Sequence, residues 1–124
     1  MEFKNNEAIY LQIADYVSEH ILLGRWLPDE KVPSVRELAS MLEVNPNTVM
    51  RSYDQLQQME IIYNKRGMGF FVEKEAVARI KKDQKSRFLE HELPSFFKNL
   101  YLLDISLDEI TEKYTEYRNE NYSK

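Results

Sequence analysis

The sequence predicts a mainly α-helical protein with one small β-hairpin. Three observations support this fold class. Apolar residues recur every three or four positions through most of the chain, which is the period of an amphipathic helix. Serine or asparagine precedes several of these segments, where either residue is a typical helix cap. The period changes near residues 61–74, where β-branched and aromatic residues flank a turn that contains glycine.

The first helix is predicted to begin near Glu7 and to run for about four turns. Its apolar stripe comprises Ile9, Ile13, Val17 and Ile21, widened by Tyr10, Ala14 and Tyr16. Gly24 follows the last residue of this stripe and suits a left-handed C-cap. Residues 25–33 contain two prolines and predict a short extended loop.

Two short helices are predicted next, with only Glu43–Asn45 between their apolar faces. Ser34 and Glu37 have the spacing of a capping box, so the second helix is expected to begin at Ser34. Asn45 is expected to cap the third helix, and Pro46 suits its first turn because no amide hydrogen is needed there. The predicted buried faces are Val35, Leu38, Ala39 and Leu42 on the second helix, and Val49, Ser52, Tyr53, Leu56 and Met59 on the third.

Two short strands are predicted at residues 61–64 and 70–74, around the turn 65–69. Helix, helix, tight turn, helix and hairpin is the element order of a winged helix-turn-helix. In a helix-turn-helix, the N-terminal part of the second helix enters the major groove of DNA.

Asn45, Asn47, Thr48 and Arg51 stand at the head of that helix. Asparagine can pair with adenine edges, arginine with guanine, and threonine with bases or phosphates. The alternative is that Asn45 and Thr48 are merely caps and that Arg51 is a solvated charge. The adjacent hairpin favours DNA binding, because a wing beside such a helix can straddle a duplex.

The charge balance limits how DNA would be bound. The chain has a net charge of −4, and residues 1–75 contain 8 basic and 12 acidic side chains. DNA-binding domains are often basic, so binding here would depend on a few well-placed cations. The chain has no cysteine, no apolar run near the roughly 18 residues of a membrane span, and no signal-peptide pattern. We therefore expect a cytoplasmic protein.

Residues 76–124 are predicted to be helical again, with a break or restart at Pro94 and a second capping box at Ser106 and Glu109. We expect a winged helix-turn-helix DNA-binding domain at residues 1–75 and a helical dimerisation region at residues 76–124. Large apolar residues are too numerous for an exposed surface in this short region. The residues expected in a dimer interface are Phe96, Phe97, Leu100 and Leu103.

No pattern in the sequence indicates catalysis, a cofactor or a metal site. His91 lies between two glutamates, but no second histidine is near it in the sequence. The basic residues of 79–87 are typical of a solvated face, with an accessory phosphate contact as the alternative.

Residues 7–72 resemble the DNA-binding domain of GntR-family transcriptional regulators. The shared features, in order, are Ile9–Tyr10 with Gln12, Pro33–Arg36, Asn45–Val49 with Arg51, and Arg66–Gly69. The C-terminal region resembles the YtrA-type subfamily, whose members carry a small helical dimerisation region in place of a large effector domain. The family usually has glycine where this chain has Asp29 and Glu60, and both positions are expected in turns.

The resemblance implies DNA contacts at the start of the second helix, at the head of the third and in the wing, with Tyr53 in the core. The residues are Ser34, Arg36, Asn45, Asn47, Thr48, Arg51, Lys65, Arg66, Gly67 and Gly69.

We therefore expect a homodimeric, non-enzymatic regulator, most simply a repressor, that binds an inverted-repeat DNA operator. Two alternatives stay open: a winged-helix adaptor for another protein, and a regulator with a small-molecule site at the helical dimer interface. The sequence does not identify an effector.

Overall fold

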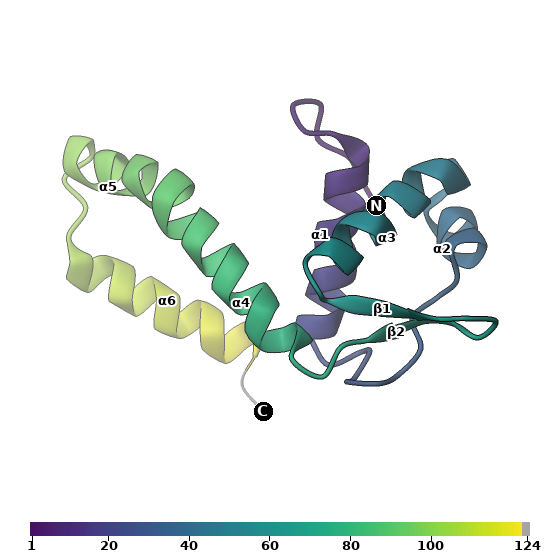
Figure 1. Cartoon of the computed structure of the whole chain (residues 1–124). Helices are drawn as coiled ribbons and strands as arrows, with labels where there is room; N and C mark the ends of the chain where they lie inside the picture. The colour runs from purple at the N-terminus through teal and green to yellow at the C-terminus, as the bar shows by residue number, and fades with distance from the viewer. Residues whose placement is uncertain (123–124) are drawn as a thin grey trace. The chain divides into compact units, whose positions relative to one another are not determined.

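Helices α1 (Ile9–Leu22) and α3 (Pro46–Gln58) cross at the centre of the N-terminal part of the chain (Figure 1). The computed structural model describes residues 1–122. Most of the predicted stripe of α1 is buried, including Ile13, Val17 and Ile21. Gly24 adopts a φ of +78° just after the helix, which confirms the predicted left-handed cap.

The capping residues begin α2 (Val35–Leu42) and α3 as predicted. The Glu37 amide donates to Ser34 Oγ at 3.1 Å, and the Ser34 amide donates to Glu37 Oε1 at 2.8 Å. These two bonds are the predicted capping box, and they satisfy amide groups that the first turn of the helix leaves unpaired. A left-handed residue, Glu43, ends α2 with a φ of +55°, so that α3 can begin three residues later at Pro46.

Strands β1 (Ile62–Lys65) and β2 (Gly69–Val72) form the predicted antiparallel hairpin, with Lys65 opposite Gly69. Each strand therefore extends one residue closer to the turn than the sequence pattern indicated. The loop before α2 runs beside β2, because the Val32 amide donates to Phe70 O at 2.9 Å and the Asp29 amide to Val72 O at 2.7 Å. This pairing attaches the hairpin to the helical core.

Asp29 and Glu60, which stand where the resembled family usually has glycine, both adopt left-handed backbone with φ of +64° and +59°. This conformation is costly for a residue with a side chain. Each side chain makes a contact that glycine lacks. The Tyr63 hydroxyl donates to Asp29 Oδ1 at 2.9 Å, and the carboxylate of Glu60 lies 3.5 Å from the Arg79 guanidinium.

The first compact unit extends beyond the predicted boundary after Glu75 and ends at Gln84, within α4 (Ala76–Arg87). Ala76 and Ile80 are buried with α1, α3 and the strands in one apolar core. Arg79 Nη1 also donates to Glu60 O at 2.7 Å, just after the end of α3. The first turns of α4 are therefore part of the winged unit.

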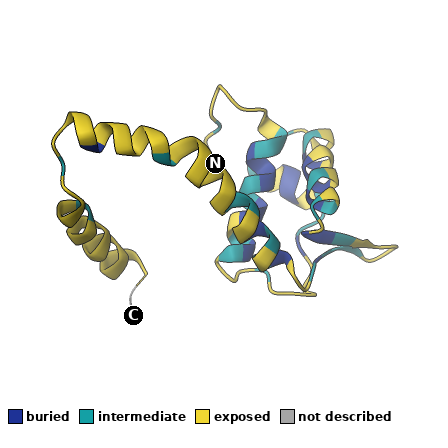
Figure 2. Cartoon of the chain, turned by 60° about the vertical axis from the view of Figure 1, so that its left-hand side comes forward, coloured by how far each residue is buried: buried dark blue, intermediate teal, exposed yellow. Residues whose placement is uncertain are grey.

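The second unit, residues 85–124, contains the end of α4, a π-helical turn η1 (Phe88–Glu92), α5 (Leu93–Leu102) and α6 (Leu107–Asn121). α4, η1 and α5 follow one another without an intervening loop. Pro94 stands in the first turn of α5, where its missing amide hydrogen is tolerated. At α6, the Glu109 amide donates to Ser106 Oγ at 3.2 Å, as one bond of the predicted capping box. Figure 2 shows that α5 and α6 are almost entirely exposed, whereas α1–α3 carry a buried core.

Candidate nucleic-acid interface

The inner face of α3 is anchored by buried residues. Val49, Ser52 and Tyr53 are fully buried. The Tyr53 hydroxyl donates to Pro33 O at 2.6 Å, and burial raises the pKa of Tyr53 far above its usual value. Tyr53 thus packs in the core as expected, and it holds α3 against the loop that leads into α2.

The outer face at the head of α3 presents Asn47, Thr48 and Arg51. Residues three and four positions apart lie on the same face of a helix, so Arg51 stands next to both of the others. Asn47 and Arg51 are exposed and Thr48 is partly exposed. The Arg51 Cζ lies 4.0 Å from the centroid of the Tyr10 ring. A polar surface with amide, hydroxyl and guanidinium groups is therefore displayed on a rigidly packed helix.

Asn45 caps α3 through its side chain. Its Oδ1 accepts a hydrogen bond from the Asn47 amide at 2.8 Å, which confirms the predicted cap. The cap uses the side-chain oxygen of Asn45, and the side-chain amide nitrogen takes no part in it. At the start of α2, Ser34 is likewise a cap, while Arg36 is exposed in the first turn. The pKa of the Glu37 carboxyl is lowered, mainly by the hydrogen bond from the Ser34 backbone and next by the interaction with the Ser34 side chain.

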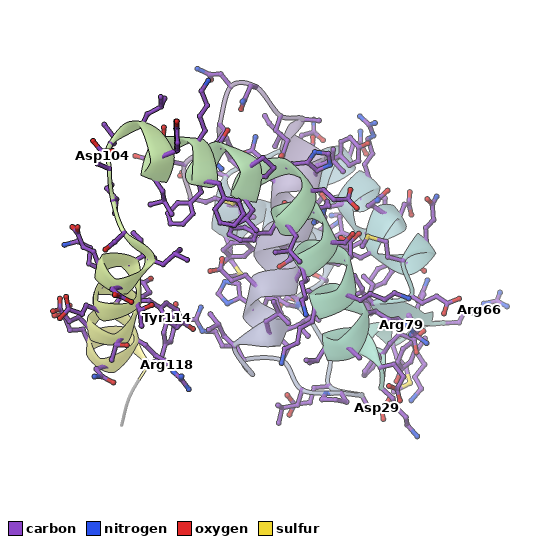
Figure 3. The ribbon with its side chains drawn as sticks, turned by 90° about the vertical axis from the view of Figure 1, so that its left-hand side faces the viewer. Asp29, Arg66, Arg79, Asp104, Tyr114 and Arg118 are labelled. Atoms are coloured by element: carbon purple, nitrogen blue, oxygen red, sulfur yellow. The ribbon has the colours of Figure 1, made fainter. Side chains whose placement is uncertain are left out.

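The wing presents two exposed cations at the turn of the hairpin. Lys65 ends β1 and Arg66 begins the turn, and Figure 3 shows Arg66 extending away from the hairpin. The Met68 amide donates to Lys65 O at 2.8 Å, which closes the turn. Gly67 has a φ of +76°, a backbone conformation that glycine adopts without strain.

Lys31 is a third cation at the wing, and the sequence pattern did not identify it. It forms an antiparallel bridge with Phe71 of β2, and a Cβ added to Gly69 would lie 2.8 Å from Lys31 Cε. Gly69 therefore gives the Lys31 side chain room to cross β2. The pairing joins a loop residue to a strand about forty positions later in the sequence, which local patterns do not reveal.

Replacing Gly69 with alanine is expected to destabilise the protein more than the matched change Gly67→Ala. Gly67 has a φ of +76°, close to the left-handed region, where a side chain costs about 1–2 kcal/mol. Gly69 has a φ of +117°, which lies outside that region and is less favourable still for alanine. Space around Gly67 is open, whereas an added methyl at Gly69 would have to displace Lys31. Chemical denaturation of both variants measures the difference. Equal losses in the free energy of unfolding would show that neither the φ of +117° nor the contact with Lys31 disfavours alanine at position 69 more than at position 67.

The four residues expected in the dimer interface do not share one environment. Phe96, Phe97 and Leu103 are 41%, 52% and 66% exposed, whereas Leu100 is buried at 8%. Leu100 therefore packs within its own helical unit. Other large side chains of this unit are exposed as well, namely Tyr101, Leu102, Leu107, Tyr114 and Tyr117.

Residues 1–122 contain neither a cluster of metal-binding side chains nor a membrane-spanning helix. No group of three or more histidine, aspartate or glutamate side chains there has the arrangement of a metal site. None of the helices in this part of the chain is long and apolar enough to cross a membrane.

Known families and proteins include relatives of most of this chain. The family model described as "Bacterial regulatory proteins, gntR family" matches residues 9–72. YhcF, an uncharacterized HTH-type transcriptional regulator of Bacillus subtilis, is 34% identical over 111 residues, which is 90% of each chain. The HTH-type transcriptional repressor YtrA of the same organism is 30% identical over 109 residues, or 88% of this chain and 83% of YtrA.

Solved structures are similar as well. A protein of Bacteroides thetaiotaomicron assigned to the GntR family is 50% identical with a TM-score of 0.71, over 91% of this chain and 98% of that one. The DNA-binding domain of AraR in complex with operator ORR3 is 28% identical with a TM-score of 0.50, over 58% of this chain and 90% of that one.

Proposed function

Since this chain belongs to the GntR family of bacterial regulatory proteins, we propose that it is a repressor that binds an inverted-repeat operator as a homodimer. The family consists of DNA-binding transcriptional regulators and is not enzymatic. The observation that carries the proposal is the exposed polar head of α3 in the same unit as a basic wing. A regulator of this family would act in the cytoplasm of a bacterial cell, where the DNA is.

In the proposed complex, the head of α3 enters the major groove. Asn47, Thr48 and Arg51 lie toward the base edges, and the free amide groups at the start of the helix favour a phosphate. Ser34, Arg36 and Asn45 flank them at the starts of the two helices. AraR, whose DNA-binding domain has the same fold, is a protein solved on its operator.

The wing holds the adjacent backbone or minor groove. Positive charge comes from Lys65, Arg66 and Lys31. Gly67 and Gly69 have no side chains, so the turn can approach the DNA closely. Residues 1–75 as a whole are acidic, since 12 acidic side chains exceed 8 basic ones. This excess weakens non-specific attraction to DNA and makes binding depend on the few cations at the interface.

The homodimer is supported by the second unit. Its helices expose a series of large apolar side chains while, within the described residues, Leu100 is its one buried hydrophobic side chain. A patch of this kind marks an interaction site, and a self-complementary patch gives a two-fold dimer. Two winged units related by a two-fold axis match an inverted repeat. Repression then requires only that the dimer occupies a promoter, and the relative YtrA is named a repressor.

The proposal predicts that Arg36 and Arg51 contribute to sequence readout. A duplex would first be selected from a randomised library by the full-length protein. Changing a base-contacting arginine to alanine is then expected to cost about 1–3 kcal/mol of binding and to relax one position in each half-site. Binding to the selected duplex and to a scrambled one measures both effects, with Lys74→Ala as a control at an exposed cation beyond β2.

Two results would contradict the proposal. If no duplex is enriched, or if affinity is insensitive to salt, the protein does not bind DNA through its cations. Equal losses on both duplexes would mean that the arginines only hold the backbone.

A further inference from the structure

Two consecutive residues of α3 contact the same residue of α1. The Arg51 guanidinium lies over the Tyr10 ring, with 4.0 Å between Cζ and the ring centroid. Ser52 Oγ donates to the backbone oxygen of Tyr10 at 2.7 Å. Ser52 is fully buried, so this bond is part of the core. The backbone of Tyr10 is thus held against α3, and its ring lies under Arg51, the one cation of that helix.

Stacking on Tyr10 occupies a flat face of the Arg51 guanidinium and leaves its N–H edge available. A guanidinium stacks on an aromatic ring through its flat face, while its N–H donors point outward in the plane of the group. Those donors are the groups that pair with guanine or phosphate. A long arginine side chain on a bare helix would lose its rotamer freedom only on binding. The ring restricts that freedom beforehand, which reduces the entropic cost of binding.

The support under the ring is itself held in place. Gln12, two residues after Tyr10 on α1, is buried and bonds the segment before the helix. Its Nε2 donates to Lys4 O at 2.8 Å and to Glu7 O at 2.9 Å, and its Oε1 accepts from the Lys4 amide at 2.7 Å. The first turn of α1 is therefore fixed on one side by α3 and on the other by the N-terminal segment.

We propose that Tyr10 is a positioning residue that holds the Arg51 guanidinium edge-on for base recognition. This inference rests on the proposed function, since it assigns Arg51 to the DNA. It adds a residue from α1, outside the helix-turn-helix and the wing, to the determinants of specificity.

The first test needs no DNA. In the full-length protein, the Arg51 side-chain NMR resonances are expected to show the ring-current shift of a stacked guanidinium. Tyr10→Leu should abolish this shift and Tyr10→Phe should keep it. The bond from Ser52 goes to the backbone of Tyr10, so both variants retain it. An Arg51 resonance that is unshifted in the unmodified protein would overturn the proposal.

The second test uses the duplex that the unmodified protein selects from a randomised library. Tyr10→Leu is expected to weaken binding roughly two- to fivefold, the range of an exposed cation–π contact. It should relax the same base position as Arg51→Ala, and it should have no further effect in the Arg51→Ala background. Tyr10→Phe should restore both affinity and preference. Tyr16→Leu, which removes another ring from α1, is the matched control and should leave the base preference intact.

The remaining outcomes separate this inference from the proposed function. Enrichment of no duplex would refute DNA binding, while the NMR result would still report whether the stack exists. Tyr10→Phe binding as weakly as Tyr10→Leu would show that the hydroxyl itself contacts DNA, which overturns positioning through Arg51. Tighter binding by Tyr10→Leu would show that the stack withholds Arg51 from the duplex, which also overturns it.

Discussion

Replacing Phe97 with glutamate is expected to shift the protein to a monomer and to weaken operator binding roughly a hundredfold. Phe97 is 52% exposed on α5, so a single chain tolerates the change. In the proposed dimer the new carboxylate would be buried without a partner, which is strongly unfavourable. Each monomer would then bind one half-site on its own, without the gain in affinity that comes from linking two half-site contacts. Light scattering reports the oligomeric state, and titration of the selected duplex reports the affinity.

Ser95→Glu is a matched control for this variant. It adds the same charge to the same helix at an exposed position roughly opposite Phe97. It should leave both the dimer and the affinity intact. A Phe97→Glu protein that is still dimeric would show that the apolar face serves another partner. A monomer with undiminished affinity would show that operator binding does not require dimerisation.

A chain shortened to residues 1–75 is expected to lose its fold, whereas residues 1–84 should remain folded. The shorter chain lacks Ala76 and Ile80, which are both buried in the core of the winged unit. Truncating a buried isoleucine to alanine alone costs about 2–5 kcal/mol, a large part of the 5–15 kcal/mol stability of a typical domain. Arg79 would also be absent, which leaves Glu60 without its ion pair. Circular dichroism with thermal denaturation compares the two fragments.

Ile80→Ala in the full-length chain separates the loss of this side chain from the loss of the helix. It should lower the free energy of unfolding by about 2–5 kcal/mol, while the neighbouring exposed change Lys81→Ala should have little effect. If residues 1–75 fold as stably as residues 1–84, the packing of α4 is not required by the winged unit.

The first turns of α4 therefore belong to the part of the protein that is proposed to bind DNA. Arg79 Nη1 donates to the backbone oxygen of Glu60 at 2.7 Å, two residues after the end of α3. Glycine at position 60 would remove the ion pair but not the backbone bond. The contacts of Arg79 with Glu60 thus stabilise a residue with a side chain at a left-handed backbone position.

The sequence by itself determined the features that depend on neighbours along the chain. Ser34, Asn45 and Gly24 identify where helices begin or end, because caps bond or turn the backbone within a few residues. The hairpin around Gly67 follows from the same kind of local rule. The polar head of α3 was also predicted, since helical spacing alone separates its buried and exposed faces.

Only the tertiary structure decided the features that join distant segments. The end of the winged unit at Gln84 depends on Ile80 reaching a core made by earlier helices. The place of Lys31 beside Gly69 depends on a strand pairing across about forty residues. The stack of Arg51 on Tyr10 depends on the crossing of α1 and α3. Each is a contact between distant residues that a local period does not reveal, because burial and pairing are fixed by packing in three dimensions.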